Sequence, residues 1–233
     1  MDTKKLIVNA DDFGQSEGIN KGIIHAFENG ILTSASLMVR YAHAKHAAQY
    51  ANENNLDLGL HVDLGEWILK DGNWITVYEV VPQENIELVK EEIHKQLDSF
   101  IQITGKKPTH IDSHQHVHKQ QSIQPLFLEI ARDLNITLRR CSDKVNYCGG
   151  FYGQNSDGSP NHHSIGVGNL IDLIATLPTG ITEVACHPGL EVTIQTMYKL
   201  EREIEVNSLC SLEAQEAITR LKVELVSFAG IPF

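Results

Sequence analysis

Two adjacent carboxylates, Asp11 and Asp12, follow the apolar run LIVNA at residues 6–10 and precede Phe13-Gly14. A continuous apolar run is typical of a parallel strand buried on both faces, and α/β folds place their chemistry at the carboxyl ends of such strands. Two like charges side by side are costly to bury unless a cation or a proton compensates them. The pair therefore indicates a catalytic site, although an Asx-type turn before the next helix would use the same residue types.

Histidines follow three further predicted strands. They are His61 after Leu58-Gly59-Leu60, His187 in the string CHPG at 186–189, and His114, His116 and His118 after Ile111-Asp112-Ser113. The carboxyl ends of parallel strands open onto one face, so these side chains are expected to converge with the carboxylates. Imidazoles and a carboxylate form a site suited to Zn, Mn, Co or Fe(II), and a hydrolase leaves a position open for water. The sequence therefore predicts a metal site.

Each histidine also has a simpler interpretation. If residues 114–118 are extended, alternation places His114, His116 and His118 on one side of the chain, yet one ion rarely binds all three. At least one of them is then expected to support a ligand or to contact substrate. Asp112 either orients a ligand imidazole or only ends its strand. His61 alone could be structural, and His187 alone could cap the turn before Pro188.

The elements that must position these residues alternate between strands and helices. The expected strands cover residues 6–10, 37–39, 56–62, 109–112, 136–138, 183–186 and 223–228, and the expected helices cover 16–29, 42–51, 86–104, 123–134, 167–177 and 212–222. About seven parallel strands alternating with helices predict an α/β fold and favour a (β/α) barrel over an open sheet. Two long polar and aromatic segments, 67–82 and 146–168, are predicted to be loops that line a substrate site.

Composition limits the classes of partner. The chain has 233 residues, no linker-like or low-complexity stretch, and is predicted to form a single domain over 1–233. A formal net charge of −11 argues against a nucleic-acid or anionic-membrane partner, and Arg139-Arg140 is too small a cluster to change that. The absence of a signal-peptide pattern, of a membrane-spanning apolar run and of Cys-x-x-Cys pairs predicts a cytoplasmic protein with reduced thiols. A homodimer is a candidate assembly, since two-fold dimers are the commonest oligomers.

Four strings in the same order resemble the YdjC-like carbohydrate deacetylase family: LIVNADDFG at 6–14, GLH at 59–61, THIDSHQHVH at 109–118 and CHPG at 186–189. The resemblance spans most of the chain. It implies a distorted (β/α) barrel like that of the polysaccharide deacetylases, with a divalent metal held by one Asp and two His. It also implies a hydrolase that removes N-acetyl groups from amino sugars such as chitooligosaccharides and releases acetate.

The resemblance assigns roles position by position. Asp12, His61 and His114 match the metal ligands, Asp11 matches the candidate general base, and His187 matches a candidate general acid. Gln115 stands where family members often carry a third consecutive imidazole, and His116 and His118 are expected to be supporting or substrate-facing groups. The family resemblance implies Mg²⁺, although two imidazole ligands suit Zn²⁺ or another transition metal better.

Two other functions use the same residues. The pair His116-Val117-His118 is a His-x-His arrangement of the sort that binds two metals in amidohydrolase- and phosphoesterase-type barrels. A barrel that keeps the metal and the sugar pocket but only binds a carbohydrate is the second alternative. Metal stoichiometry separates the first from a deacetylase, and acetate release separates the second.

Overall fold

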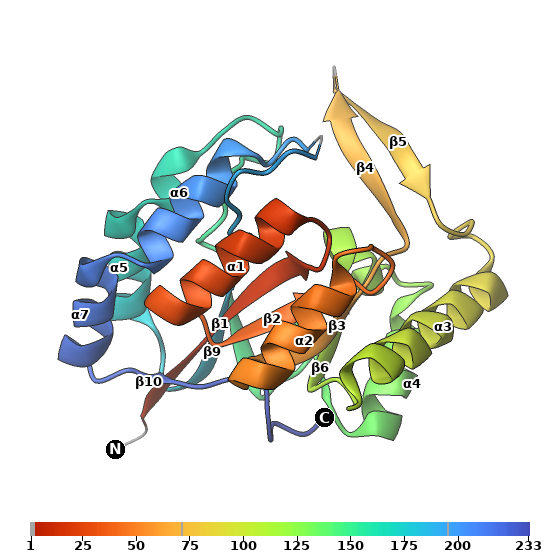
Figure 1. Ribbon diagram of the computed structural model, residues 1–233, viewed down its shortest axis with the longest axis horizontal. Helices are drawn as coiled ribbons and strands as arrows, with labels where there is room; N and C mark the ends of the chain where they lie inside the picture. The colour runs from red at the N-terminus through yellow and green to blue at the C-terminus, as the bar shows by residue number, and fades with distance from the viewer. Residues whose placement is uncertain (1–2, 71, 195) are drawn as a thin grey trace.

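The computed structural model describes residues 3–70, 72–194 and 196–233. Its main sheet is parallel throughout and runs in the order β7-β6-β3-β2-β1-β9-β8, with β10 pairing β1 off this path (Figure 1). The strands are β1 (Lys4–Phe13), β2 (Ser34–Leu37), β3 (Asp57–Val62), β6 (His110–Ser113), β7 (Thr137–Leu138), β8 (Val145–Cys148), β9 (Gly180–Cys186) and β10 (Glu224–Leu225). Because β7 and β8 form its two edges, this curved sheet is a distorted, half-open barrel, which confirms the predicted α/β class.

Helices connect the parallel strands and cover the sheet, with α1 and α2 over the face nearest the viewer in Figure 1. They are α1 (Glu17–Asn29), α2 (Ala44–Asn54), α3 (Ile86–Thr104), α4 (Gln124–Leu134), α5 (Val167–Thr176), α6 (Leu200–Leu209) and α7 (Leu212–Arg220). Their ends follow from local chemistry. The Ser16 hydroxyl accepts the Ile19 N–H at the start of α1, and Gly105 ends α3 at φ 71°. Apart from α6, these helices each bury an apolar face in the core.

The predicted loop at 67–82 is wrong. Apart from residue 71, which lies outside the described residues, this segment is mostly an antiparallel hairpin of β4 (Gly65–Lys70) and β5 (Asn73–Glu79). Its β-branched and aromatic residues favour a strand, and Gly72 at φ 77° provides the turn. The hairpin extends away from the main sheet at the top of Figure 1.

Four other expectations need correction. The strand expected at 37–39 lies at Ser34–Leu37 instead. The final strand is shorter than 223–228, since only Glu224–Leu225 pair with β1. The expected loop 146–168 contains most of β8 and a short 3-10 helix, His162–Ile165. Helix α6 was not predicted at all. Its residues Glu201, Arg202 and Glu205 are buried rather than exposed, so the sequence gives little amphipathic signal there.

No helix in the described parts of the chain is both long and apolar enough to cross a membrane.

The strand register brings the candidate residues together, because His61 on β3 pairs with Asp112 on β6, and Asn9 on β1 pairs with Ala185 on β9. The neighbouring residues Asp11 and His187 therefore lie at adjacent strand ends, as expected for parallel strands.

Candidate metal centre and its cavity

The carboxylates Asp11 and Asp12 lie in a β-bulge. Ala10 pairs with Ala35 and Phe13 with Leu37, so two residues of β1 oppose one residue of β2. Asp12 has φ 68°, in the left-handed region. In a regular strand, neighbouring side chains point to opposite faces, and a bulge re-aims one of them. Consequently both carboxylates, each 1% exposed, line the same cavity.

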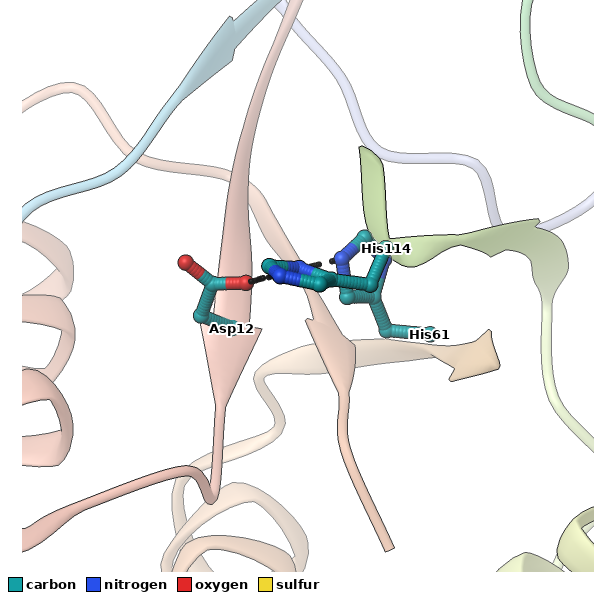
Figure 2. A group of neighbouring side chains, drawn as sticks. All are labelled: Asp12, His61 and His114. Atoms are coloured by element: carbon teal, nitrogen blue, oxygen red, sulfur yellow. Dashed lines mark hydrogen bonds and ion pairs between the residues drawn. The ribbon is translucent and has the colours of Figure 1, made fainter. Parts of the chain in front are cut away.

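Three of the predicted ligands surround one point (Figure 2). The Asp12 Oδ1 atom lies 3.1 Å from His114 Nδ1 and 3.5 Å from His61 Nε2, and one ligand atom from each residue lies within 4.8 Å of the others. One carboxylate and two imidazoles are a donor set suited to a divalent transition ion. The geometry therefore brings Asp12, His61 and His114 together as a candidate metal site.

Asp112 orients the imidazole of His61. Its Oδ1 lies 2.8 Å from His61 Nδ1, which leaves Nε2 facing Asp12. A carboxylate on the far nitrogen fixes the orientation of a metal-ligating histidine and makes it a better donor. This arrangement fits a metal site, because His61 Nε2, the nitrogen that lies next to the Asp12 carboxylate, is left free to bind an ion. Of the two roles considered for Asp112, the structure supports the orienting one.

The second oxygen of Asp12 is bound by an arginine that the sequence analysis did not find. Arg202, on α6, donates from Nη2 to Asp12 Oδ2 at 2.6 Å, and from Nη1 to the His187 carbonyl at 3.2 Å. Burial alone would raise the pKa of Asp12, but the Arg202 charge and hydrogen bonds from His114 and His61 hold this pKa well below its usual value. Asp12 is therefore ionised at neutral pH, as a metal ligand must be.

A second buried arginine neutralises the other carboxylate. The Arg139 guanidinium is 1% exposed and contacts Asp11 at 2.6 Å, as well as Asp112 and Glu183. Burial opposes ionisation of Asp11, but the positive charge of Arg139 overcomes it, with smaller help from His61 and His187, and the pKa of Asp11 is lowered. Asp11 is therefore a carboxylate, able to accept a proton, beside the candidate metal ligand Asp12.

Replacing Arg139 by Met is expected to lower the free energy of unfolding by about 3–5 kcal/mol, because three buried carboxylates would lose their shared cation. Urea unfolding followed by circular dichroism measures this. Arg139→Lys, which keeps a positive charge, should lose less, and Arg220→Met, at an exposed position, should be close to wild type. An Arg139→Met protein within about 1 kcal/mol of wild type would contradict the assigned role.

His187 lies beside Asp11, with its Nε2 atom 3.8 Å from Asp11 Oδ2. Helix α6 holds the His187 backbone from both sides, since the Glu205 carboxylate accepts its N–H and Arg202 donates to its carbonyl. Burial lowers the pKa of His187 to about 4, although Asp11 and Asp12 act in the opposite direction. The imidazole is therefore neutral at neutral pH before any reaction begins.

The expectation that residues 114–118 are extended is wrong. They form a 3-10 turn in which Gln115 and His116 have φ 50° and 56°, so their side chains diverge. His118 accepts the Ser113 N–H at Nδ1 and lies 3.2 Å from the Arg139 carbonyl at Nε2, which leaves it no nitrogen for a metal. His116 lines the cavity. His118 is thus a supporting group, and His116 faces the cavity.

A second set, Asp11, His61 and Asp112, also has ligand atoms within 4.8 Å of one another. Both of its carboxylates are already paired with Arg139, however, and His61 Nδ1 is held by Asp112. A cation at this point would face the Arg139 guanidinium. The described residues therefore favour one metal position at Asp12, His61 and His114 over a two-metal arrangement.

The candidate site opens into a cavity of about 760 Å³. Its floor contains the carboxylates and histidines, one wall comes from the hairpin, and the opposite wall comes from loops near Tyr152 and Tyr198. Aromatic side chains beside polar groups suit a sugar, since a pyranose has apolar faces and hydroxyl edges. Trp67 and Trp74 both line this cavity.

Four residues that support the site escaped the sequence analysis: Arg139, Glu183, Arg202 and Glu205. Arg139 had a usable signal, because it directly follows the strand Thr137–Leu138 and so occupies a strand end like the other site residues. Arg202 and Glu205 lie within a helix, and Glu183 lies within a strand. Nothing in their local sequence distinguishes them from surface charges, so only the packing of α6 and β9 reveals them.

Comparisons with known proteins give matches by sequence and by fold. The family model described as YdjC-like protein matches residues 5–220. The chain is 31% identical to the carbohydrate deacetylase of Clostridium beijerinckii, over 97% of this chain and 100% of that one, and 34% identical to the chitooligosaccharide deacetylase of Klebsiella pneumoniae, over 91% and 94%. A crystal structure from Enterococcus faecalis superposes with a TM-score of 0.78 at 28% identity, covering 99% and 100%. A family 4 carbohydrate esterase from Streptomyces lividans shares the fold, with a TM-score of 0.58 at 9% identity, covering 97% and 93%.

Proposed function

This chain belongs to the YdjC-like protein family, and from that premise we propose that it is a metal-dependent deacetylase of N-acetylated amino sugars such as chitooligosaccharides. The products are acetate and a free amine. The observation that carries the proposal is the convergence of Asp11 and His187 with the candidate ligands Asp12, His61 and His114 on the floor of one cavity. The names of the relatives support the same substrate class.

Asp12, His61 and His114 would hold one divalent ion. When bound, such an ion supplies Lewis acidity, polarising an amide carbonyl and making water more acidic. The resemblance to the family favours Mg²⁺, whereas the two imidazole donors favour Zn²⁺ or another transition metal. We propose that the site accepts more than one of these ions and that their relative activities identify the preferred one.

Asp11 is proposed to take a proton from the water that attacks the acetyl carbonyl carbon. The carbon–nitrogen bond then breaks, the water oxygen leaves in acetate, and the amine nitrogen takes up a proton. His187 is neutral at the start, so it must gain the proton that it donates. Asp11 is 3.8 Å from His187 Nε2 and is therefore the proposed source, which returns both residues to their starting states.

Acetate release from N,N'-diacetylchitobiose by the metal-stripped protein, with Mg²⁺, Zn²⁺, Mn²⁺, Co²⁺ or no ion added back, tests this proposal. We expect release that depends on added metal, with one ion bound per chain. Two tightly bound ions would favour an amidohydrolase- or phosphoesterase-type enzyme instead. Sugar binding without acetate release under any ion, for this and other N-acetylated sugars, would favour the binding-only barrel and overturn the deacetylase proposal.

The single domain over 1–233, the cytoplasmic location and the homodimer stay predictions. The acetylated sugar is the proposed partner. Sedimentation of the purified protein measures the assembly directly, because one species near the chain mass of 26.0 kDa would exclude a stable dimer.

A further inference from the structure

The hairpin of β4 and β5 supplies a wall of the cavity. Trp67, Ile68, Leu69 and Trp74 line it from this side, and we call these four residues the hairpin wall. The first three are half-buried, whereas Trp74 is 69% exposed. The hairpin projects from the main sheet in Figure 1, and a two-stranded hairpin is only marginally stable by itself. Its position relative to the site therefore depends on contacts with the rest of the chain.

The base of the hairpin is fixed by a buried carboxylate. Asp63 Oδ1 accepts hydrogen bonds from the Gly65 N–H at 3.1 Å and from the Tyr78 hydroxyl at 3.0 Å. The Val80 N–H adds a backbone bond to the Leu64 carbonyl. Because Gly65 and Tyr78 lie where the hairpin leaves the sheet, these bonds hold its base. The direction in which the hairpin wall points is therefore set by contacts further along β4.

Gln115 makes such a contact. Its Oε1 accepts the Trp67 N–H at 2.9 Å, and its Nε2 donates to the Trp67 carbonyl at 2.8 Å. One carboxamide thus binds both backbone groups of Trp67, as a neighbouring strand would. Glutamine can do this because a single planar group offers a donor and an acceptor, whereas glutamate offers acceptors only.

The backbone of Gln115 makes this contact compatible with metal binding next to it. Gln115 has φ 50°, and this left-handed turn sends its side chain to the hairpin while His114, the preceding residue, faces Asp12. The hairpin wall and a candidate metal ligand are therefore joined through adjacent residues. We propose that Gln115 is a positioning residue, which sets the hairpin wall at a fixed distance from the reacting acetyl group and so determines how the sugar is held.

This inference rests on the proposed deacetylase function, but its first test does not require activity. In Gln115→Ala, we expect the Trp67 amide to exchange with deuterium at least tenfold faster than in wild type, since its acceptor is removed. The Val80 amide, at the base, should keep its wild-type rate. Gln83→Ala removes another side-chain amide near the hairpin, outside the cavity, and serves as the matched control.

The second test measures substrate use. With N,N'-diacetylchitobiose, Gln115→Ala should raise KM by about tenfold, the order expected for two lost hydrogen bonds, with metal content and kcat near wild type. Gln115→Glu should raise KM as well, because it keeps the length but not the donor. Gln83→Ala should change neither constant.

An unchanged Trp67 exchange rate in Gln115→Ala would overturn the proposal, as would faster exchange with an unchanged KM. Loss of bound metal in Gln115→Ala would also overturn it, since the residue would then act on His114 rather than on the hairpin wall. If the wild-type protein releases no acetate, the proposed function fails, whereas the exchange experiment still decides whether Gln115 holds the hairpin.

Discussion

Asp11→Asn is expected to retain one bound metal ion and to lower kcat by about 10²–10⁴-fold, the usual contribution of a general base. The substitution keeps the shape of the side chain. Its remaining oxygen can still accept from Asn9 Nδ2 and Arg139 Nη1, which now bind Asp11 Oδ1 at 2.9 and 2.6 Å. What is lost is the basic oxygen that faces His187. Steady-state rates of acetate release and the metal content of the same sample measure both quantities.

Glu183→Gln is the matched control for this prediction. Glu183 shares Arg139 with Asp11 but does not line the cavity, so the substitution disturbs the same charge cluster without removing the candidate base. We expect it to keep most of the wild-type kcat. Near-wild-type kcat in Asp11→Asn would show that Asp11 is not the base. Equal losses in both variants would assign the effect to the charge balance around Arg139.

His61→Ala is expected to abolish stoichiometric metal binding and, with it, acetate release. Asp12 and His114 alone would leave two protein ligands, fewer than the three that catalytic zinc sites use. Isothermal titration with Zn²⁺ and metal analysis after dialysis measure the loss. His114→Ala should behave in the same way, and because His114 is more exposed than His61 it is the variant less prone to disturb the fold.

The control for the histidine variants is His94→Ala on the exposed face of α3. It should bind one ion and keep wild-type activity, which excludes adventitious binding by surface histidines. Full metal occupancy in both His61→Ala and His114→Ala would rule out the assigned ligand set. If only one of the two variants loses its metal, the histidine replaced in that variant is a ligand and the other histidine is not.

Much of the site could be predicted because its residues follow strands. Asp11, Asp12, His61 and His114 each come at the end of a predicted strand, and the geometry of parallel strands brings such ends to one face. Glycine adds to this local signal. A Cβ at Gly59, in the GLH string, would lie 2.2 Å from ring atoms of His110, so the close packing of β3 and β6 requires glycine there. These constraints act over a few residues and are visible in the chain itself.

Other features depend on residues that are distant in sequence. The hairpin was mistaken for a loop, because its strands pair only with each other and their pattern resembles polar loop composition. Helix α6 was missed because Arg202 and Glu205 point inward, where Arg202 pairs with Asp12 and Glu205 accepts the His187 N–H. The turn at Gln115 and His116 likewise reversed an expectation drawn from strand alternation.

The sequence by itself determined the α/β class and the candidate residues Asp11, Asp12, His61, His114 and His187, because alternating strand and helix segments and polar strand ends are local patterns. Only the tertiary structure decided the ionisation of these side chains and the direction in which they point. Arg139 lies 128 residues from Asp11, and Arg202 lies 190 residues from Asp12, yet they neutralise the two buried carboxylates. Burial makes such pairing necessary, but the partner is chosen by folding, since a cation at any distance along the chain can meet the requirement.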